Sequence, residues 1–381
     1  MRSSDTLSYV LTYGWTLSYD GTSDDVLGVY KALRMRGYDA VVLAPFGSDR
    51  LVRNSFVSLT KSGRIPRFLS RLHLRLFPLL EFLTLVKGVK ERGVPKLVWY
   101  IHFPYSPLSP FLLPLALLRL LRALGAKVVV DYVDTLEVGR GRLTDLLTAC
   151  AADALVTVSP ELAESLSARV GRRCEYLPNF PPLDDRVSGE LDDGSEGFVG
   201  ELARFKTVFL FVDGQPCADS RLDVWLDRMG GLSVFRDSAL VLIGGGCQGV
   251  RDACRKHGIR LFELGFRPHL SVIRRIVEAK RNTNVIALGL FGHSYYPTIP
   301  SKLQLYYACG LPFITSRLRV SKVVCRGGNG CATVDPYDPD EVSRAVRTLS
   351  GARSPCPPEL DSRRLMEKVG EIASRVTGRP A

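Results

Sequence analysis

The chain contains 381 residues, of which 46% are apolar and 24% are charged, and its formal net charge is +12. These values exclude a disordered chain and leave room for two hydrophobic cores. The excess of positive charge suggests an acidic partner: nucleic acid, anionic lipid or a phosphorylated ligand.

The first half of the chain predicts buried strands that alternate with helices. Five segments read as strands: SYVLTYG, DAVVLAP, KLVWYIH, KVVVDYV and ALVTVS. Helical patterns occupy residues 24–37 and 159–171. In the second of these, Ser159 is the expected N-cap and Pro160 suits the first turn.

One apolar segment, PLSPFLLPLALLRLL at residues 107–121, is the best candidate for a membrane span. It contains three prolines and meets Arg119 before it reaches the roughly 18 apolar residues that a span needs. We therefore expect no span, although a contact with one membrane face stays open. The segment MRSSDTLSYV at the start has no apolar signal run, which predicts a cytoplasmic protein.

The second half repeats the alternation of strands and helices. Its strand candidates are TVFLFVDG, ALVLIGGG, IRLFELG, NVIALGL, LPFITS and CATVDP. Continuous apolar runs of this kind are typical of strands buried on both faces of a parallel sheet. We predict an α/β protein with two Rossmann-like, doubly wound domains that face a cleft. The expected parts are an N-terminal domain at 1–180, a linker or mobile loop at 181–206, a C-terminal domain at 207–355 and a helix that packs back at 356–381.

The nine cysteines are scattered and form no CxxC pair, and the chain has only five histidines. This pattern argues against a zinc site. Buried free thiols are the simplest interpretation, and a Cys325–Cys331 disulfide is an alternative.

Several strand ends of the second half carry residues that suit a phosphate or a nucleotide. Ser301 and Lys302 begin a helical segment whose N-terminus offers free N–H groups; a plain Ser cap with a solvated lysine is the alternative. Glycines after strands let the backbone approach a ligand, or simply form turns. The candidates of this second kind are Gly214, Gly244 and Gly245, with Phe266 and Arg267 at a third strand end.

The first half offers a second group of candidates. Gly21 and Thr22 precede the first helix and are candidates to face the cleft and contact the nucleotide, with a plain helix cap at Ser23 or Asp24 as the alternative. His102 ends a strand and is a candidate ligand contact in the cleft, although a lone histidine is more often structural. Asp131 and Asp134 also lie at the end of a strand. A carboxylate there suits a general base, and an N-cap or loop carboxylate is the alternative.

Taken in order, several segments resemble the GT-B glycosyltransferases of the family 4, or "glycosyl transferases group 1", type. The segments are GTSDDVLGVYKALRMRGYDAVVLAP, ADALVTVSPELAESLSARVGRRCEYLPNF, PSKLQLYYACGLPFI and GGNGCATVDPYDPDEVSRAVRTL, and together they span most of the chain. The resemblance implies transfer of a sugar from a nucleotide-diphosphate donor. It also implies that no cofactor and no metal ion are needed, because helix ends and cations hold the diphosphate. It assigns the acceptor to the first domain and the nucleotide sugar to the second.

The chain also departs from this family pattern. The Glu-x7-Glu pair of the family falls at Pro297 and Leu305, and its histidine falls at Val133. The usual Arg and Lys on the diphosphate fall at Gly214 and Ser220. The resemblance leaves Asp134 as the catalytic candidate, and Lys302 and Arg221 as the cations that replace the usual pair.

Most of the net charge lies in one window. Residues 50–127 hold fourteen Lys and Arg and two acids, Glu81 and Glu91. Arg67, Arg71 and Arg75 recur every fourth residue beside a parallel apolar row, which predicts a basic amphipathic helix. Such helices bind anionic membrane surfaces, whereas an ordinary core-facing helix with a solvated basic face is the alternative. Nucleic acid is not expected, because no known reading motif is present.

Three functions follow from these observations. The first is a peripheral membrane glycosyltransferase that acts on a lipid-linked or membrane-associated glycan. The second is a catalytically silent GT-B domain that binds a glycan or assists a transferase, and the third is a GT-B sugar-nucleotide epimerase.

Overall fold

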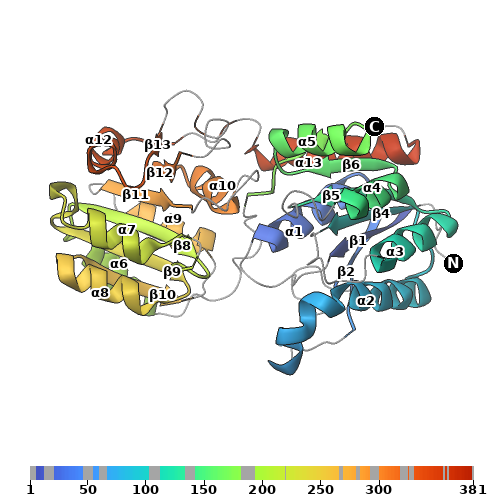
Figure 1. The fold of residues 1–381 in the computed structure, drawn as a ribbon, viewed down its shortest axis with the longest axis horizontal. Coiled ribbons are helices and arrows are strands. Elements are labelled where there is room, and N and C mark those ends of the chain that lie inside the picture. Colours follow the sequence, from blue (N-terminus) through green and yellow to red (C-terminus); the bar gives the residue numbers. More distant parts are fainter. Residues whose placement is uncertain are drawn as a thin grey trace. The chain divides into compact units, whose positions relative to one another are not determined.

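The computed structural model describes most of the chain, in two compact units. The described residues are 6–12, 21–45, 55–59, 67–102, 112–133, 142–181, 194–218, 220–265, 269–279, 284–291, 300–317, 325, 330–354, 357 and 360–379. The N-terminal unit comprises Met1–Leu183 and Glu359–Ala381, and the C-terminal unit comprises Asp184–Pro358. Both units are α/β, as the alternating sequence pattern predicts (Figure 1).

The N-terminal unit is built on a seven-stranded sheet in the order β3-β2-β1-β4-β5-β6-β7. Its strand pairs are parallel. The strands are β1 (Leu7–Thr12), β2 (Asp39–Leu43), β3 (Phe56–Val57), β4 (Leu97–His102), β5 (Lys127–Tyr132), β6 (Ala154–Thr157) and β7 (Glu175–Tyr176). Every residue of β1 is buried, as expected for a strand in the middle of a parallel sheet.

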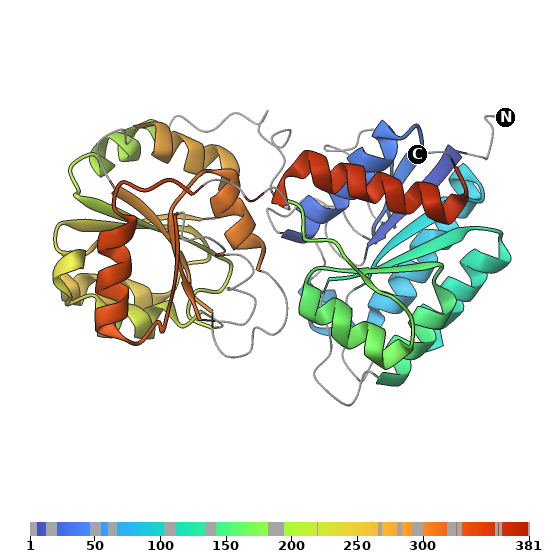
Figure 2. The same ribbon diagram turned by 90° about the horizontal axis from the view of Figure 1, so that it is seen from above.

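Helices cover both faces of this sheet. The elements are α1 (Gly21–Met35), α2 (Arg67–Arg92), α3 (Leu112–Ala123), α4 (Arg142–Ala151), α5 (Pro160–Val170) and α13 (Ser362–Thr377). One core cluster joins the sheet to α1 and α13, and a second joins its other face to α2, α3, α4 and α5 (Figure 2). The C-terminal helix α13 therefore packs beside α1 and completes the core of the N-terminal unit.

Helix α5 shows how closely the local sequence specifies an element. The hydroxyl of Ser159 accepts a hydrogen bond from the Leu162 N–H at 3.1 Å, and Pro160 occupies the first turn. Gly171 ends the helix in the left-handed conformation, with φ of 67°. The predicted N-cap is therefore confirmed.

The C-terminal unit is built on a six-stranded sheet in the order β10-β9-β8-β11-β12-β13, again with parallel pairs. The strands are β8 (Thr207–Asp213), β9 (Ser238–Gly244), β10 (Arg260–Gly265), β11 (Asn284–Gly289), β12 (Phe313–Ser316) and β13 (Cys331–Val334). Strand β8 lies in the middle of the sheet, and its last residue, Asp213, pairs with Gly244 of β9. Loops that leave β8 and β9 therefore start side by side.

The helices of the C-terminal unit are α6 (Gly194–Leu202), α7 (Leu222–Met229), α8 (Gln248–His257), α9 (His269–Ala279), α10 (Ser301–Ala308) and α12 (Pro339–Leu349), with a 3-10 helix at Ser233–Phe235. One core cluster packs α7, α8 and α12 on one face of the sheet. Helix α6 contacts α9. The segment at 181–206, predicted as a linker or loop, therefore includes a helix, whose Leu202 is fully buried.

Within the described part of the chain, two disulfides are present, Cys217–Cys247 and Cys325–Cys331. The second was the alternative that the sequence left open, whereas the first was not anticipated. Cys174 and Cys254 are buried thiols outside these bonds, as expected, whereas Cys150 is exposed and Cys309 is half-buried. Among the described helices, none is long and apolar enough to cross a membrane.

Candidate functional site

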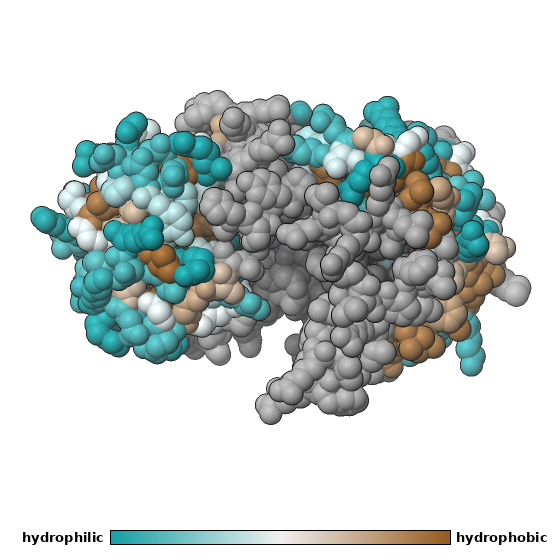
Figure 3. Space-filling model, viewed as in Figure 1, coloured by the Kyte–Doolittle hydropathy of each residue, from teal (hydrophilic) through white to brown (hydrophobic). Residues whose placement is uncertain are grey.

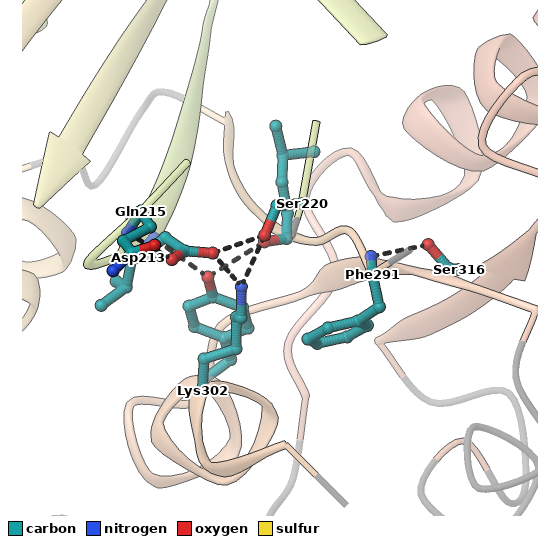
Figure 4. Close-up of polar contacts among 9 residues, drawn as sticks. Asp213, Gln215, Ser220, Phe291, Lys302 and Ser316 are labelled. Carbon is teal, nitrogen blue, oxygen red and sulfur yellow. Dashed lines mark hydrogen bonds and ion pairs between the residues drawn. The ribbon is translucent and has the colours of Figure 1, made fainter. Parts of the chain in front are cut away.

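A partly buried polar cluster of the C-terminal unit forms around Lys302, in the first turn of α10. Its Nζ lies 2.8 Å from Asp213 Oδ2, at the end of β8, and 3.4 Å from Ser220 Oγ, just before α7 (Figure 4). The Ser220 hydroxyl donates to the same Asp213 oxygen. Side chains from two segments far apart in sequence, Asp213 with Ser220 and Lys302, therefore meet at the carboxyl end of the central strand. Ligands bind at this end of the strands in open α/β sheets.

The surroundings of this cluster are apolar and nearly closed. The Lys302 ammonium lies 4.7 Å from the ring centroids of both Phe211 and Phe291, a distance at which a ring face attracts a cation. Only 12% of the Lys302 side chain and 15% of the Asp213 side chain are exposed. Figure 4 shows the lysine side chain rising from α10 toward Asp213 and Ser220, with the Phe291 ring beside it. Lys302 is therefore neither the solvated lysine of the sequence alternative nor an open point charge.

The Asp213 carboxylate is held in its charged form. Burial is the largest single influence and opposes its charge, whereas the charge of the neighbouring Lys302 ammonium favours it. Hydrogen bonds from Lys302, Ser220 and the Gln215 N–H, the last at 2.9 Å, act in the same direction. Together they lower the pKa of Asp213 below its usual value. The pair is thus ionised at neutral pH and almost neutral overall.

Two loops with glycines that the sequence offered as candidates start beside the cluster. Gly214 follows β8, and Gly244 and Gly245 end β9 and begin the next loop. The Gly245 N–H donates to the Asp213 carbonyl at 2.9 Å. A Cβ on Gly244 would lie 2.1 Å from that same carbonyl oxygen, and the φ of Gly244 is +123°. Only glycine fits at this position, because both the space and the backbone conformation exclude a side chain.

The N-terminus of α10 differs from the predicted cap. Pro300 is the N-cap, no side chain caps the helix, and Ser301 is its first residue. The alternative of a plain Ser301 cap is therefore wrong, because Pro300 takes the cap position and Ser301 already has helical geometry. Arg221 follows Ser220 and is the N-cap of α7, with φ of 46°. Its side chain is exposed to solvent.

The position of the missing glutamate is apolar in the structure as well. Leu305 lies in α10, and its side chain is buried in the core, with 3% exposed. Beside it, Gln304 is fully buried, and neither its amide nitrogen nor its amide oxygen has a hydrogen-bond partner among the residues that the structure describes. A buried amide without partners is uncommon in proteins and is a group that a bound ligand can satisfy.

The candidates of the N-terminal unit are placed less completely. Gly21 and Thr22 form the first turn of α1, and His102 is the last residue of β4. Asp131 is the penultimate residue of β5 and is 4% exposed, so it is neither a loop carboxylate nor an N-cap. Its Oδ2 accepts a 3.0 Å hydrogen bond from the Trp99 indole. Burial raises the pKa of Asp131 to about 6, against the opposing effect of that hydrogen bond.

Three predicted residues, Asp134, Phe266 and Arg267, lie outside the described residues. Pro297, at the other missing glutamate, lies outside them too. Among the residues that the structure describes, no cluster of His, Cys, Asp and Glu side chains could hold a metal ion.

Sequence reasoning missed Asp213, Ser220, Phe211 and Phe291 as parts of the cluster. A signal for Asp213 existed, because it is a carboxylate at the end of a buried strand directly before a glycine. That rule selected Asp131 and Asp134 in the first half of the chain. The two phenylalanines carry no such signal, since each lies in an apolar run typical of any buried strand.

Comparison with known proteins identifies solved structures of the same architecture. No protein-family model matches the chain, and neither does any curated protein sequence. Solved structures match over nearly the full length. Sucrose-phosphate synthase from Thermosynechococcus elongatus has a TM-score of 0.65 at 14% identity, covering 98% of this chain and 99% of that one.

Two further matches have similar extents. HepE from Anabaena, solved in complex with UDP, has a TM-score of 0.57 at 13% identity, covering 98% of this chain and 95% of that one. UDP-GlcNAc 2-epimerase from Methanocaldococcus jannaschii has a TM-score of 0.57 at 11% identity, covering 96% and 99%. The similar structures thus include both glycosyltransferases and epimerases. At these identities the similarity establishes the architecture, and the chain has the two-domain GT-B fold.

Proposed function

We propose that the chain is a glycosyltransferase of the family 4 type, which moves a sugar from a nucleotide-diphosphate donor to a lipid-linked or membrane-associated glycan. The observation that carries the proposal is the position of Lys302, in the first turn of α10 and at the carboxyl end of β8. A helix N-terminus, a cation and two glycine loops together suit a diphosphate.

In this proposal the diphosphate is bound without a metal ion. Lys302 supplies the charge, the first N–H groups of α10 donate hydrogen bonds, and Gly214, Gly244 and Gly245 let the backbone come close. Because Asp213 already neutralises Lys302, a phosphate must compete with that carboxylate for the ammonium. In this proposal, Asp213 therefore limits the strength of the interaction between the Lys302 ammonium and the donor phosphates.

The acceptor part of the proposal concerns α2. Its exposed large apolar residues, Leu79, Leu83 and Val86, are 40–43% exposed, and the exposed Lys90 continues their row at helical spacing. Hydrophobic surface gathers over α2 and α3 in Figure 3. An apolar row in a basic window suits an anionic membrane, so we place the protein on the cytoplasmic face of a membrane, peripherally bound.

Thermal unfolding with UDP, GDP, dTDP, ADP and their sugars tests the donor site. A nucleotide at about 100 times its dissociation constant adds roughly 2.7 kcal/mol to the free energy of unfolding, which shifts the midpoint visibly. Lys302→Met should abolish the shift, whereas Asp213→Asn should enlarge it by releasing the ammonium. Lys256→Met is the matched control, because Lys256 pairs with Asp227 on the surface of the same unit. The proposal fails if no nucleotide shifts the wild-type protein.

Two alternatives have support of their own. Similarity to UDP-GlcNAc 2-epimerases favours an epimerase that acts on a free nucleotide sugar. Conversion of a nucleotide sugar without any acceptor would select it. Neutralisation of Lys302 and the apolar Leu305 favour a silent GT-B domain, for which the same experiment predicts no nucleotide binding.

A further inference from the structure

The Cys217–Cys247 disulfide joins the two glycine loops of the candidate donor site. Cys217 lies three residues after Gly214 in the loop from β8 to α7, and Cys247 is the N-cap of α8, two residues after Gly245. Their Cα atoms are 6.3 Å apart. Both residues are partly buried and pack against the core of the C-terminal unit. The bond thus crosses between neighbouring loops at the same edge of the sheet.

The β8–α7 loop is the one that carries Ser220 to Asp213 and Lys302. At the start of this loop, the Gly245 N–H donates a hydrogen bond to the Asp213 carbonyl. At the end of the loop, the Ser220 hydroxyl donates a hydrogen bond to the Asp213 carboxylate. Between these points, Cys217 is the covalent link to the neighbouring loop. Without this bond, the middle of the loop loses its tie to the β9–α8 loop, while the backbone contact at the start of the loop remains.

We propose that Cys217–Cys247 is a redox-sensitive staple that orders the two loops and so controls nucleotide binding at Lys302. The nucleotide part of this inference rests on the proposed function. In a cytoplasmic protein, where thiols are normally kept reduced, a disulfide between functional loops serves as a reversible sensor. The bonded form binds the nucleotide more tightly, because its loops are ordered before the ligand arrives.

The chemistry is a thiol–disulfide exchange. A dithiol such as dithiothreitol gives two electrons and two protons to the S–S bond, is itself oxidised to a cyclic disulfide, and leaves two thiols on the protein. A low-molecular-weight disulfide such as oxidised glutathione reverses the step and departs as two thiols. Ordering one backbone residue costs about as much free energy as a tenfold change in an equilibrium constant. We therefore expect about a tenfold loss of affinity on reduction.

The test uses the full chain, oxidised with oxidised glutathione or reduced with dithiothreitol. Peptide mapping identifies the bonded cysteines, hydrogen exchange follows residues 214–222, and titration with UDP and GDP gives the affinity. The Cys325→Ser/Cys331→Ser variant removes the other disulfide and should keep the full response to redox state. The Cys217→Ser/Cys247→Ser variant should behave as the reduced protein under both conditions.

Faster exchange in the loop and about tenfold weaker nucleotide binding after reduction support the staple. Equal exchange and equal affinity in both forms overturn it and leave the nucleotide site standing. If neither form binds a nucleotide, the proposed function fails; faster exchange on reduction then still supports the staple, and unchanged exchange overturns it. Free thiols at Cys217 and Cys247 under oxidising conditions also overturn it.

Discussion

Removal of the Lys302 ammonium should destabilise the C-terminal unit strongly at neutral pH and much less in acid. In the structure, Lys302 and Asp213 lie 2.8 Å apart, with side chains 12% and 15% exposed. In Lys302→Met, the Asp213 carboxylate keeps its burial but loses its counter-charge. Breaking a buried pair in this way costs about 3–5 kcal/mol, and the residual exposure favours the lower end, about 3 kcal/mol.

The ability of Asp213 to take up a proton limits this cost. With an ordinary pKa of 3.8, protonation at pH 7 costs about 4 kcal/mol, at roughly 1.36 kcal/mol per pH unit. At pH 5 the same step costs under about 2 kcal/mol, so the penalty of Lys302→Met should fall by about half. The wild-type pair behaves in the opposite way. The Asp213 pKa is lowered by folding, so the contribution of the pair is complete above about pH 4 and is lost below it.

Urea unfolding at pH 7 and pH 5 measures these differences in wild type, Lys302→Met, Asp213→Asn and the double variant. The double variant should be more stable than Lys302→Met, because no buried charge remains. The cycle should then give a coupling of at least about 2 kcal/mol. A cost below about 1 kcal/mol for Lys302→Met, or equal costs at both pH values, would refute the buried ion pair.

Three further predictions concern other parts of the chain. Folding raises the pKa of Asp131 from 3.8 to about 6, so its contribution to stability is complete below about pH 4 and is lost as the pH rises to 6. Asp131→Asn should therefore exceed wild type in unfolding free energy by up to about 3 kcal/mol at pH 7 and match it at pH 4, as urea unfolding can check. Gly244→Ala should cost at least about 2 kcal/mol in urea, and more than Gly258→Ala, whose Cβ would meet open space. Leu83→Glu should abolish co-sedimentation with anionic vesicles at unchanged stability, because Leu83 is 43% exposed; retained sedimentation would exclude the α2 surface.

The fold follows from the sequence because its signals are local and repeated. Strands such as β8 and β9 are continuous apolar runs, and a run buried on both faces implies a parallel sheet with helices between its strands. The two-residue strands β3 and β7 were missed, since two residues carry no periodic pattern. Helix α6 was missed because its Gly- and acid-containing sequence, GSEGFVGEL, is typical of a loop.

The site was predictable only in part, because its decisive contacts join distant segments. Lys302 was selected from its place at the start of a helix, which is a local property. Its partner Asp213 lies 89 residues away, and the rings of Phe211 and Phe291 come from two different strand ends. Which side chains meet at one edge depends on the strand order, and single-sequence patterns do not contain that order.

The comparison of Leu305 with Lys302 shows what a family resemblance can carry. The resemblance predicted a helix at both positions, and both residues do lie in α10. It did not predict the electrostatic environment of either residue. Where a glutamate was expected, Leu305 is packed into the core, and where a free cation was expected, Lys302 is neutralised by Asp213. A ligand phosphate at this helix therefore gains less from Lys302 than it would from an unpaired lysine. The phosphate affinity proposed for this site therefore depends on Asp213, a residue to which the resemblance assigned no role.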